Sequence, residues 1–65
     1  MLVAFGHTVR AAREERGLSQ AALADAAGIH PTYLSGIERG RRNVALRNVR
    51  AIADALGVEV RDLFA

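Results

Sequence analysis

Two hydroxyl side chains, Thr32 and Ser35, lie three positions apart in the segment 31–39, which places them on one face if this segment is a helix. Such hydroxyls can hydrogen-bond base edges in the major groove of B-DNA, and the Thr32 methyl group can touch a thymine methyl. Leu34 and Ile37 fall on the other side of the same helix. A helix that is apolar on one side and small or polar on the other fits a DNA groove.

Arginines follow this segment closely. Between residues 36 and 50 five arginines stand against one acid, Glu38, whereas residues 51–65 hold three acids and one arginine. This asymmetry favours a basic face for a polyanion, the alternative being an ordinary solvated charged surface. The expected phosphate ligands come from this stretch and from the start of an earlier helix, whose free N–H groups favour an anion: Ser19, Gln20, Arg39, Arg41, Arg42, Asn43 and Arg47.

The chain as a whole has 65 residues, which suits a single domain, 1–65, with one small core. It has a net charge of +2 and no cysteine, so disulfides and thiolate metal sites are excluded. No apolar run could span a bilayer, and the start of the chain lacks the pattern of a secretory signal. We therefore expect a cytoplasmic protein that does not enter a membrane.

The residues present argue against an enzyme. His7 and His30 have neither cysteines nor clustered carboxylates beside them, so no metal site is expected. Ser35 has no nearby candidate for a base, and no glycine-rich phosphate loop is present. We expect no cofactor and no small-molecule ligand.

Apolar residues recur at helical spacing along the whole chain, and no strand pattern is present. Gly17 ends the first predicted helix, and Ser19 is a good N-cap for the second. His30 is a weak N-cap for the third, where Pro31 suits the first turn. The predicted fold is all-α and compact, with five helices over about 2–16, 20–27, 31–39, 45–56 and 60–64. The apolar face of the fourth is expected to contain Leu46, Val49, Ile52, Ala53 and Leu56.

A tight turn joins the second and third predicted helices. Ala24 supplies the small side chain where two helices so closely linked must nearly touch, and Gly28 accepts the positive φ of the turn. Ile29, Leu34 and Ile37 then fill the angle between the helices. This combination is typical of a helix-turn-helix, the alternative being an ordinary αα-corner.

Two strings carry a family resemblance, GLSQAALADAAGIHPTYLSGIERGRRN and IADALGVEVRDLF. Together they resemble the lambda-repressor-like helix-turn-helix family, also called XRE or Cro/repressor type, over essentially the whole chain. The segment TYLSGIERGRRNVALRNVRAIADALGV looks most like the controller proteins of restriction–modification systems. The resemblance implies a transcription regulator that binds double-stranded DNA as a homodimer, with the helix 31–39 in the major groove.

The resemblance also implies roles for single residues. Gln20 matches the family's phosphate-binding glutamine, and Thr32 matches a base-reading position. Arg13 and Glu38 match a partly buried ion pair, the alternative being two exposed charges that contribute little.

At two base-reading positions the sequence departs from the family. Relatives often carry long polar side chains where this chain has Pro31 and Gly36. Each missing bidentate base contact removes roughly 1–3 kcal/mol of discrimination. We therefore expect modest base specificity that depends on Thr32, Ser35, DNA shape and the arginines.

The C-terminal end of the chain is apolar, with Val58, Val60, Leu63 and Phe64. A second copy of the chain could cover these residues as a dimer interface, or they could complete the core of one copy. Two-fold symmetry would place two copies of the helix 31–39 about 34 Å apart, one turn of DNA. The rival function is a protein-interaction module or antitoxin with the same fold, while RNA binding lacks aromatic platforms beyond Tyr33.

Overall fold

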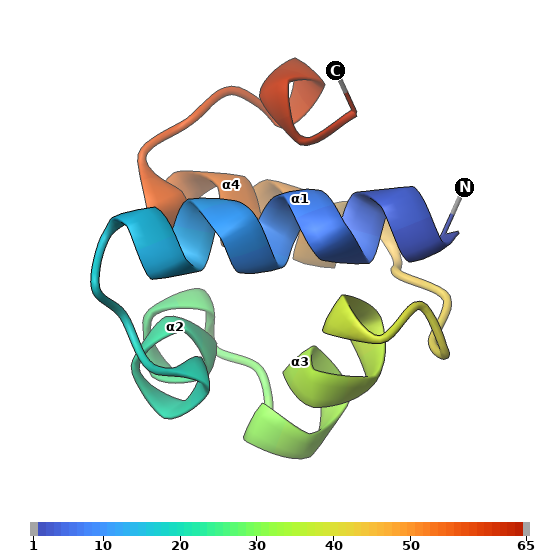
Figure 1. Cartoon of the computed structure of the whole chain (residues 1–65), viewed down its shortest axis with the longest axis horizontal. Helices are drawn as coiled ribbons and strands as arrows, with labels where there is room; N and C mark the ends of the chain where they lie inside the picture. Colours follow the sequence, from blue (N-terminus) through green and yellow to red (C-terminus); the bar gives the residue numbers. More distant parts are fainter. Residues whose placement is uncertain (1, 65) are drawn as a thin grey trace.

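The computed structural model describes residues 2–64, and all regular secondary structure in that range is helical. Four α-helices are followed by one 3₁₀ turn (Figure 1): α1 Leu2–Glu15, α2 Gln20–Ala27, α3 Pro31–Glu38, α4 Leu46–Leu56 and η1 Val60–Leu63. The all-α prediction is confirmed, but the fifth α-helix is wrong, because its four residues form a 3₁₀ turn instead. Three predicted helix ends also differ by one residue, at Arg16, Arg39 and Ala45.

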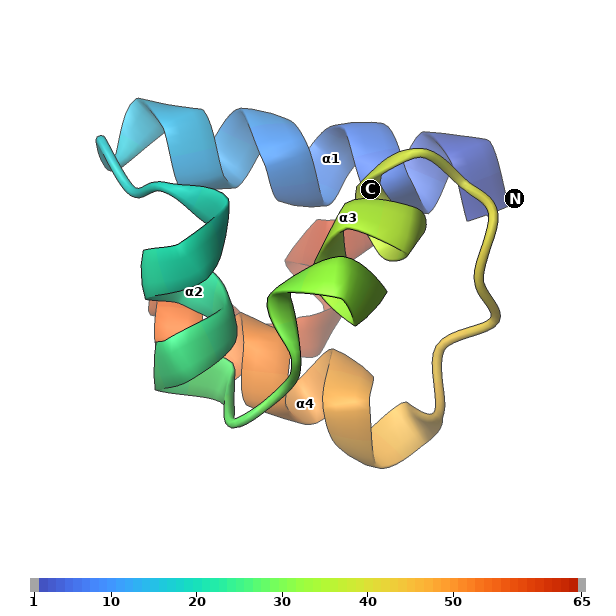
Figure 2. The ribbon, with the colours of Figure 1, turned by 90° about the horizontal axis from the view of Figure 1, so that it is seen from below.

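The helix α1 crosses the molecule, with α2 and α3 on one side and η1 on the other (Figure 1). Seen from the side of α2 and α3, the helix α4 passes behind α2 and lies on the opposite side of α3 from α1 (Figure 2). This arrangement leaves one face of α3 turned away from the rest of the protein. The loop from residue 40 to residue 45 then leads from the end of α3 to the start of α4.

The turn between α2 and α3 follows the predicted chemistry. Ser19 caps α2 by accepting a hydrogen bond from the Ala22 amide at 3.0 Å. Gly28 ends α2 in the left-handed region, with a φ of 69°, where a residue with a Cβ would be strained. Ala24 is fully buried at the helix crossing, as expected of the small residue there.

The core lies between all four helices and η1. Its largest fully buried side chains are Val9, Leu23, Leu34, Ile37, Ile52 and Leu63. Leu34 and Ile37 hold the inner face of α3 against this core, as predicted. The prediction for Leu46 is wrong: it is 77% exposed, because it stands in the first turn of α4 before that helix reaches the core.

The helices α1 and α3 approach each other at Gly6. A Cβ at this position would lie 2.3 Å from the carbonyl oxygen of Ile37 and 2.8 Å from that of Glu38. Because both neighbours are backbone atoms, they cannot move aside without shifting the helix. Gly6 therefore sets how closely α3 lies against α1 (Figure 2).

Candidate nucleic-acid interface

The outer face of α3 carries the residues predicted to read bases. Pro31 and Thr32 are exposed in its first turn, and Ser35 is half-buried one turn later. His30 caps the helix, because its Nδ1 accepts a hydrogen bond from the Thr32 amide at 3.1 Å. The structure therefore leaves Thr32 free for contact and Ser35 partly so, on a helix whose inner face is fixed by the core.

Gly36, which was also predicted at a base-reading position, is buried. The side chain of Arg42 lies over it, and a Cβ on Gly36 would come within 2.5 Å of the Arg42 Cγ. Gly36 therefore cannot present a surface of its own to a base, and this prediction is corrected. The glycine instead makes room for the aliphatic part of an arginine that comes from the following loop.

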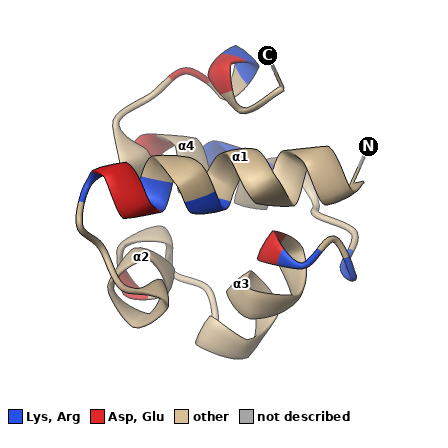
Figure 3. Ribbon diagram, viewed as in Figure 1, with Lys and Arg blue, Asp and Glu red and all other residues tan. Residues whose placement is uncertain are grey.

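Four arginines at and after the end of α3 have no ion-pair partner within residues 2–64. Arg39, Arg41, Arg42 and Arg47, which we call the arginine set, are all exposed. Within residues 2–64, none of them pairs with a carboxylate inside 4.0 Å. In Figure 3 the positive segment that directly follows α3 lies at one end of that helix. Such unpaired guanidinium groups are well suited to phosphate oxygens.

Tyr33 fixes the loop that carries Arg41 and Arg42, two members of the arginine set. Its hydroxyl donates to the carbonyl oxygen of Asn43 at 3.1 Å and accepts from the Asn48 amide at 3.3 Å. These bonds join α3, the loop and α4. Sequence reasoning considered Tyr33 only as a stacking platform and missed this role, since the partner is a backbone oxygen with no sequence signal.

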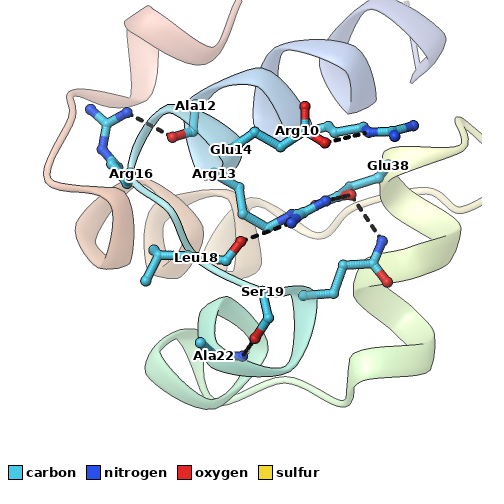
Figure 4. Close-up of polar contacts among 10 residues, drawn as sticks. Arg10, Ala12, Arg13, Glu14, Arg16, Leu18, Ser19, Ala22 and Glu38 are labelled. Atoms are coloured by element: carbon cyan, nitrogen blue, oxygen red, sulfur yellow. Dashed lines mark hydrogen bonds and ion pairs between the residues drawn. The ribbon is translucent and has the colours of Figure 1, made fainter.

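The ion pair that the resemblance implied is present. Arg13 Nε lies 2.7 Å from Glu38 Oε2, and Arg13 Nη2 lies 3.0 Å from Glu38 Oε1 (Figure 4). Arg13 Nη1 also donates to the carbonyl oxygen of Leu18 at 2.8 Å. The hydrogen bond to Glu38 raises the pKa of Arg13 above its ordinary value, against the opposing effect of burial. The pair ties α1 to the end of α3 and to the loop before α2.

The two expected phosphate ligands at the start of α2 already have partners within the protein. Gln20 Nε2 donates to Glu38 Oε1 at 2.9 Å, and Ser19 Oγ accepts the capping bond from Ala22 (Figure 4). Each keeps further hydrogen-bonding capacity, because an amide nitrogen has two hydrogens and a hydroxyl can donate while it accepts. Glu38 thus holds the Gln20 amide beside the first turn of α2.

Of the residues predicted at the dimer interface, Leu63 is 1% exposed and belongs to the core of the single chain. It is therefore removed from that set. Val58 and Val60 are half-buried. Phe64 is 52% exposed and stacks on Phe5 with ring centroids 5.0 Å apart. In the apolar C-terminal end, Leu63 thus completes the core of the single chain, while Phe64 and parts of Val58 and Val60 stay accessible.

No helix within residues 2–64 has the length and apolar character that crossing a membrane would require. In the same range, no three His, Cys, Asp or Glu residues come together as a metal site would need.

A helix-turn-helix family pattern matches residues 9–63 of the chain. The control protein C.BamHI of Bacillus amyloliquefaciens is 48% identical over 60 residues, which cover 91% of this chain and 74% of that protein. The immunity repressor protein of Bacillus phage phi105 is 44% identical over 55 residues, covering 85% of this chain but only 38% of the repressor.

Solved structures show the same fold. The restriction–modification controller protein C.AhdI from Aeromonas hydrophila superimposes with a TM-score of 0.96 at 48% identity, covering 97% of this chain and 96% of that one. The biofilm regulator SinR, solved in complex with DNA, gives a TM-score of 0.89 at 32% identity, covering 94% and 98% of the two chains. The chain belongs to the helix-turn-helix family of XRE type, whose members are DNA-binding transcriptional regulators and not enzymes.

Proposed function

We propose that this regulator binds duplex DNA as a homodimer, with α3 of each copy in the major groove, and that it acts as a restriction–modification controller in the cytoplasm. The observation that carries the groove assignment is the two-sided character of α3. Leu34 and Ile37 are buried beneath it, while Thr32 is exposed on its outer face. The controller assignment rests on the similarity to C.BamHI and C.AhdI.

Affinity and base preference are divided between different residues. The arginine set supplies phosphate contacts, which position the protein but carry no direct sequence information. Thr32 and Ser35 supply the hydroxyls for base edges, and Pro31 adds an apolar contact beside them. Base preference is therefore expected to be modest, and DNA shape contributes to it.

Selection of binding sites from random duplex DNA, followed by a salt titration, tests this function. Log affinity should fall with log salt at a slope of about −0.9 for each phosphate contacted. Arg39→Ala should weaken binding to all sequences, whereas Thr32→Ala should reduce the preference among them. Arg61→Ala is the matched control, because this exposed arginine lies in η1, on the other side of α1 from α3 (Figure 1). Absent or salt-independent duplex binding would instead favour a protein-interaction module.

The homodimer is supported by the accessible apolar side chains at the C-terminal end. Phe64 is 52% exposed, and Val58 and Val60 are half-buried nearby in the sequence. A second copy would bury these side chains further. Sedimentation at tens of micromolar without DNA should show a dimer, and a monomer at that concentration would refute a stable one.

A further inference from the structure

His30 is the N-cap residue of α3, and one of its two ring nitrogens already accepts a hydrogen bond. Its backbone is extended, with φ −71° and ψ 140°, and its Nδ1 accepts the hydrogen bond from the Thr32 amide at 3.1 Å. A ring nitrogen that accepts carries no proton, so the proton of the neutral imidazole is on Nε2. The capping bond therefore fixes both the tautomer and the orientation of the ring.

The second nitrogen of this ring is free for contact. His30 is exposed, and within residues 2–64 no hydrogen bond or ion pair engages its Nε2. Pro31, which follows, has neither an N–H group nor a polar side chain. The Nε2–H of His30 is therefore an oriented hydrogen-bond donor at the N-terminal end of α3. That end of the helix would lie nearest the bases in a major groove.

Capping alone does not account for a histidine at this position. Ser, Thr, Asp and Asn are the preferred N-cap residues, and their shorter side chains accept the same backbone bond. What the imidazole adds is a second polar atom on the far side of the ring from the cap. A serine hydroxyl that caps the helix would end close to the backbone and could not reach as far outward.

We propose that His30 contacts DNA directly, and that its Nε2–H donates a hydrogen bond to a purine N7 at the edge of the major groove. The first residues of a recognition helix are the ones that meet base edges, and N7 is an acceptor on both purines. This inference rests on the groove-binding function proposed above. It adds to Thr32 and Ser35 a third polar side chain for base contact, placed at the N-cap of α3.

The decisive variant replaces His30 with Nε2-methylhistidine by chemical synthesis of the chain. The methyl group removes the outward donor, while Nδ1 still accepts from the Thr32 amide. Affinity for a duplex selected by the unmodified protein should fall about threefold to tenfold, the value of one hydrogen bond, with unchanged thermal unfolding. Unchanged affinity would overturn the proposal.

Two substitutions separate contact from capping. His30→Ser keeps a good N-cap, so it should lose affinity as the methylated chain does while keeping the midpoint of thermal unfolding. His30→Ala loses the cap as well, and its midpoint should fall by about 4–8 °C. His7→Ser is the matched control, since this exposed histidine lies on α1, and it should bind as the wild type does. If His30→Ser also binds as the wild type does, the contact does not exist.

The nature of the acceptor is tested with altered DNA. Replacing one purine at a time by its 7-deaza analogue should weaken the unmodified protein at one position and leave the Nε2-methylhistidine protein unaffected there. Neutral methylphosphonates, placed one at a time in the backbone, serve as the comparison. If one of them weakens only the unmodified protein while no 7-deazapurine does, His30 contacts a phosphate and the proposed base contact is wrong. A different result would refute the proposed function itself: neither the wild type nor Arg39→Ala would then show salt-dependent duplex binding.

Discussion

Replacing Glu38 with glutamine tests how far the buried polar network stabilises the fold. The Glu38 carboxylate accepts two hydrogen bonds from Arg13 and one from Gln20. A glutamine has one oxygen and one NH2 group, so at least one of these donors would face another donor. The guanidinium of Arg13 would also lose its counter-charge, and arginine cannot shed its proton at neutral pH.

The size of the expected loss follows from the burial of the pair. The side chains of Arg13 and Glu38 are 11% and 2% exposed, so water does not screen the charge that remains. Breaking a buried ion pair by removing one partner costs about 3–5 kcal/mol. A domain of this length has a total stability of roughly 3–10 kcal/mol, so the variant loses a large part of it. Its midpoint of thermal unfolding should fall by at least about 12 °C.

Circular dichroism followed during heating measures this loss, with Asp54→Asn as the matched control. Asp54 pairs with Arg50 at 3.2 Å, but the two side chains are 65% and 73% exposed. Removing this surface pair should cost less than about 1 kcal/mol. Adding Arg13→Met to Glu38→Gln removes the stranded charge and should restore part of the loss. If Glu38→Gln unfolds within about 4 °C of the wild type, the ion pair does not stabilise the fold as argued.

Three further changes test other contacts. Gly6→Ala pushes a Cβ against the carbonyl oxygen of Ile37 and should destabilise the fold by about 1–3 kcal/mol, measured by urea unfolding; an unchanged midpoint would show that α1 and α3 can separate freely. Gly36→Ala should displace the Arg42 side chain and weaken duplex binding up to about fivefold without lowering stability. Fluorescence anisotropy titration measures the affinity, and an unchanged affinity would contradict this prediction. Phe64→Arg should shift sedimentation toward the monomer, and an unaltered profile would exclude Phe64 from the interface.

The helices and the turn between α2 and α3 could be predicted because their signals are local. Ser19 and Gly28 each act within a few residues of their own position, as cap and turn. Leu34 and Ile37 follow the helical repeat and are buried as expected. The Arg13–Glu38 pair spans 25 residues and was predicted only through the family resemblance, because charge alone does not reveal such a partner.

Apart from the 3₁₀ turn and three helix ends, the errors concern contacts between elements. Leu46 fits the apolar repeat of α4 but lies one turn before the core, and the sequence does not say where packing begins. Leu63 was left open between core and interface, and the fold places it in the core because η1 packs against α1 and α4. For Gly36, the missing information was the path of the loop that brings Arg42 back over α3.

The network around Glu38 and the loop held by Tyr33 have a common consequence for DNA binding. Glu38 fixes α3 against α1 and holds the Gln20 amide at the start of α2, so two elements that would flank a phosphate strand cannot move independently. Tyr33 holds the loop that carries Arg41 and Arg42 to α3 and α4. The backbone that carries Arg41 and Arg42 is therefore positioned before DNA arrives, and less backbone conformational entropy is lost on binding. The proposed interface has few base-reading side chains on α3, so such preorganisation should matter more in it than for a helix rich in long polar side chains.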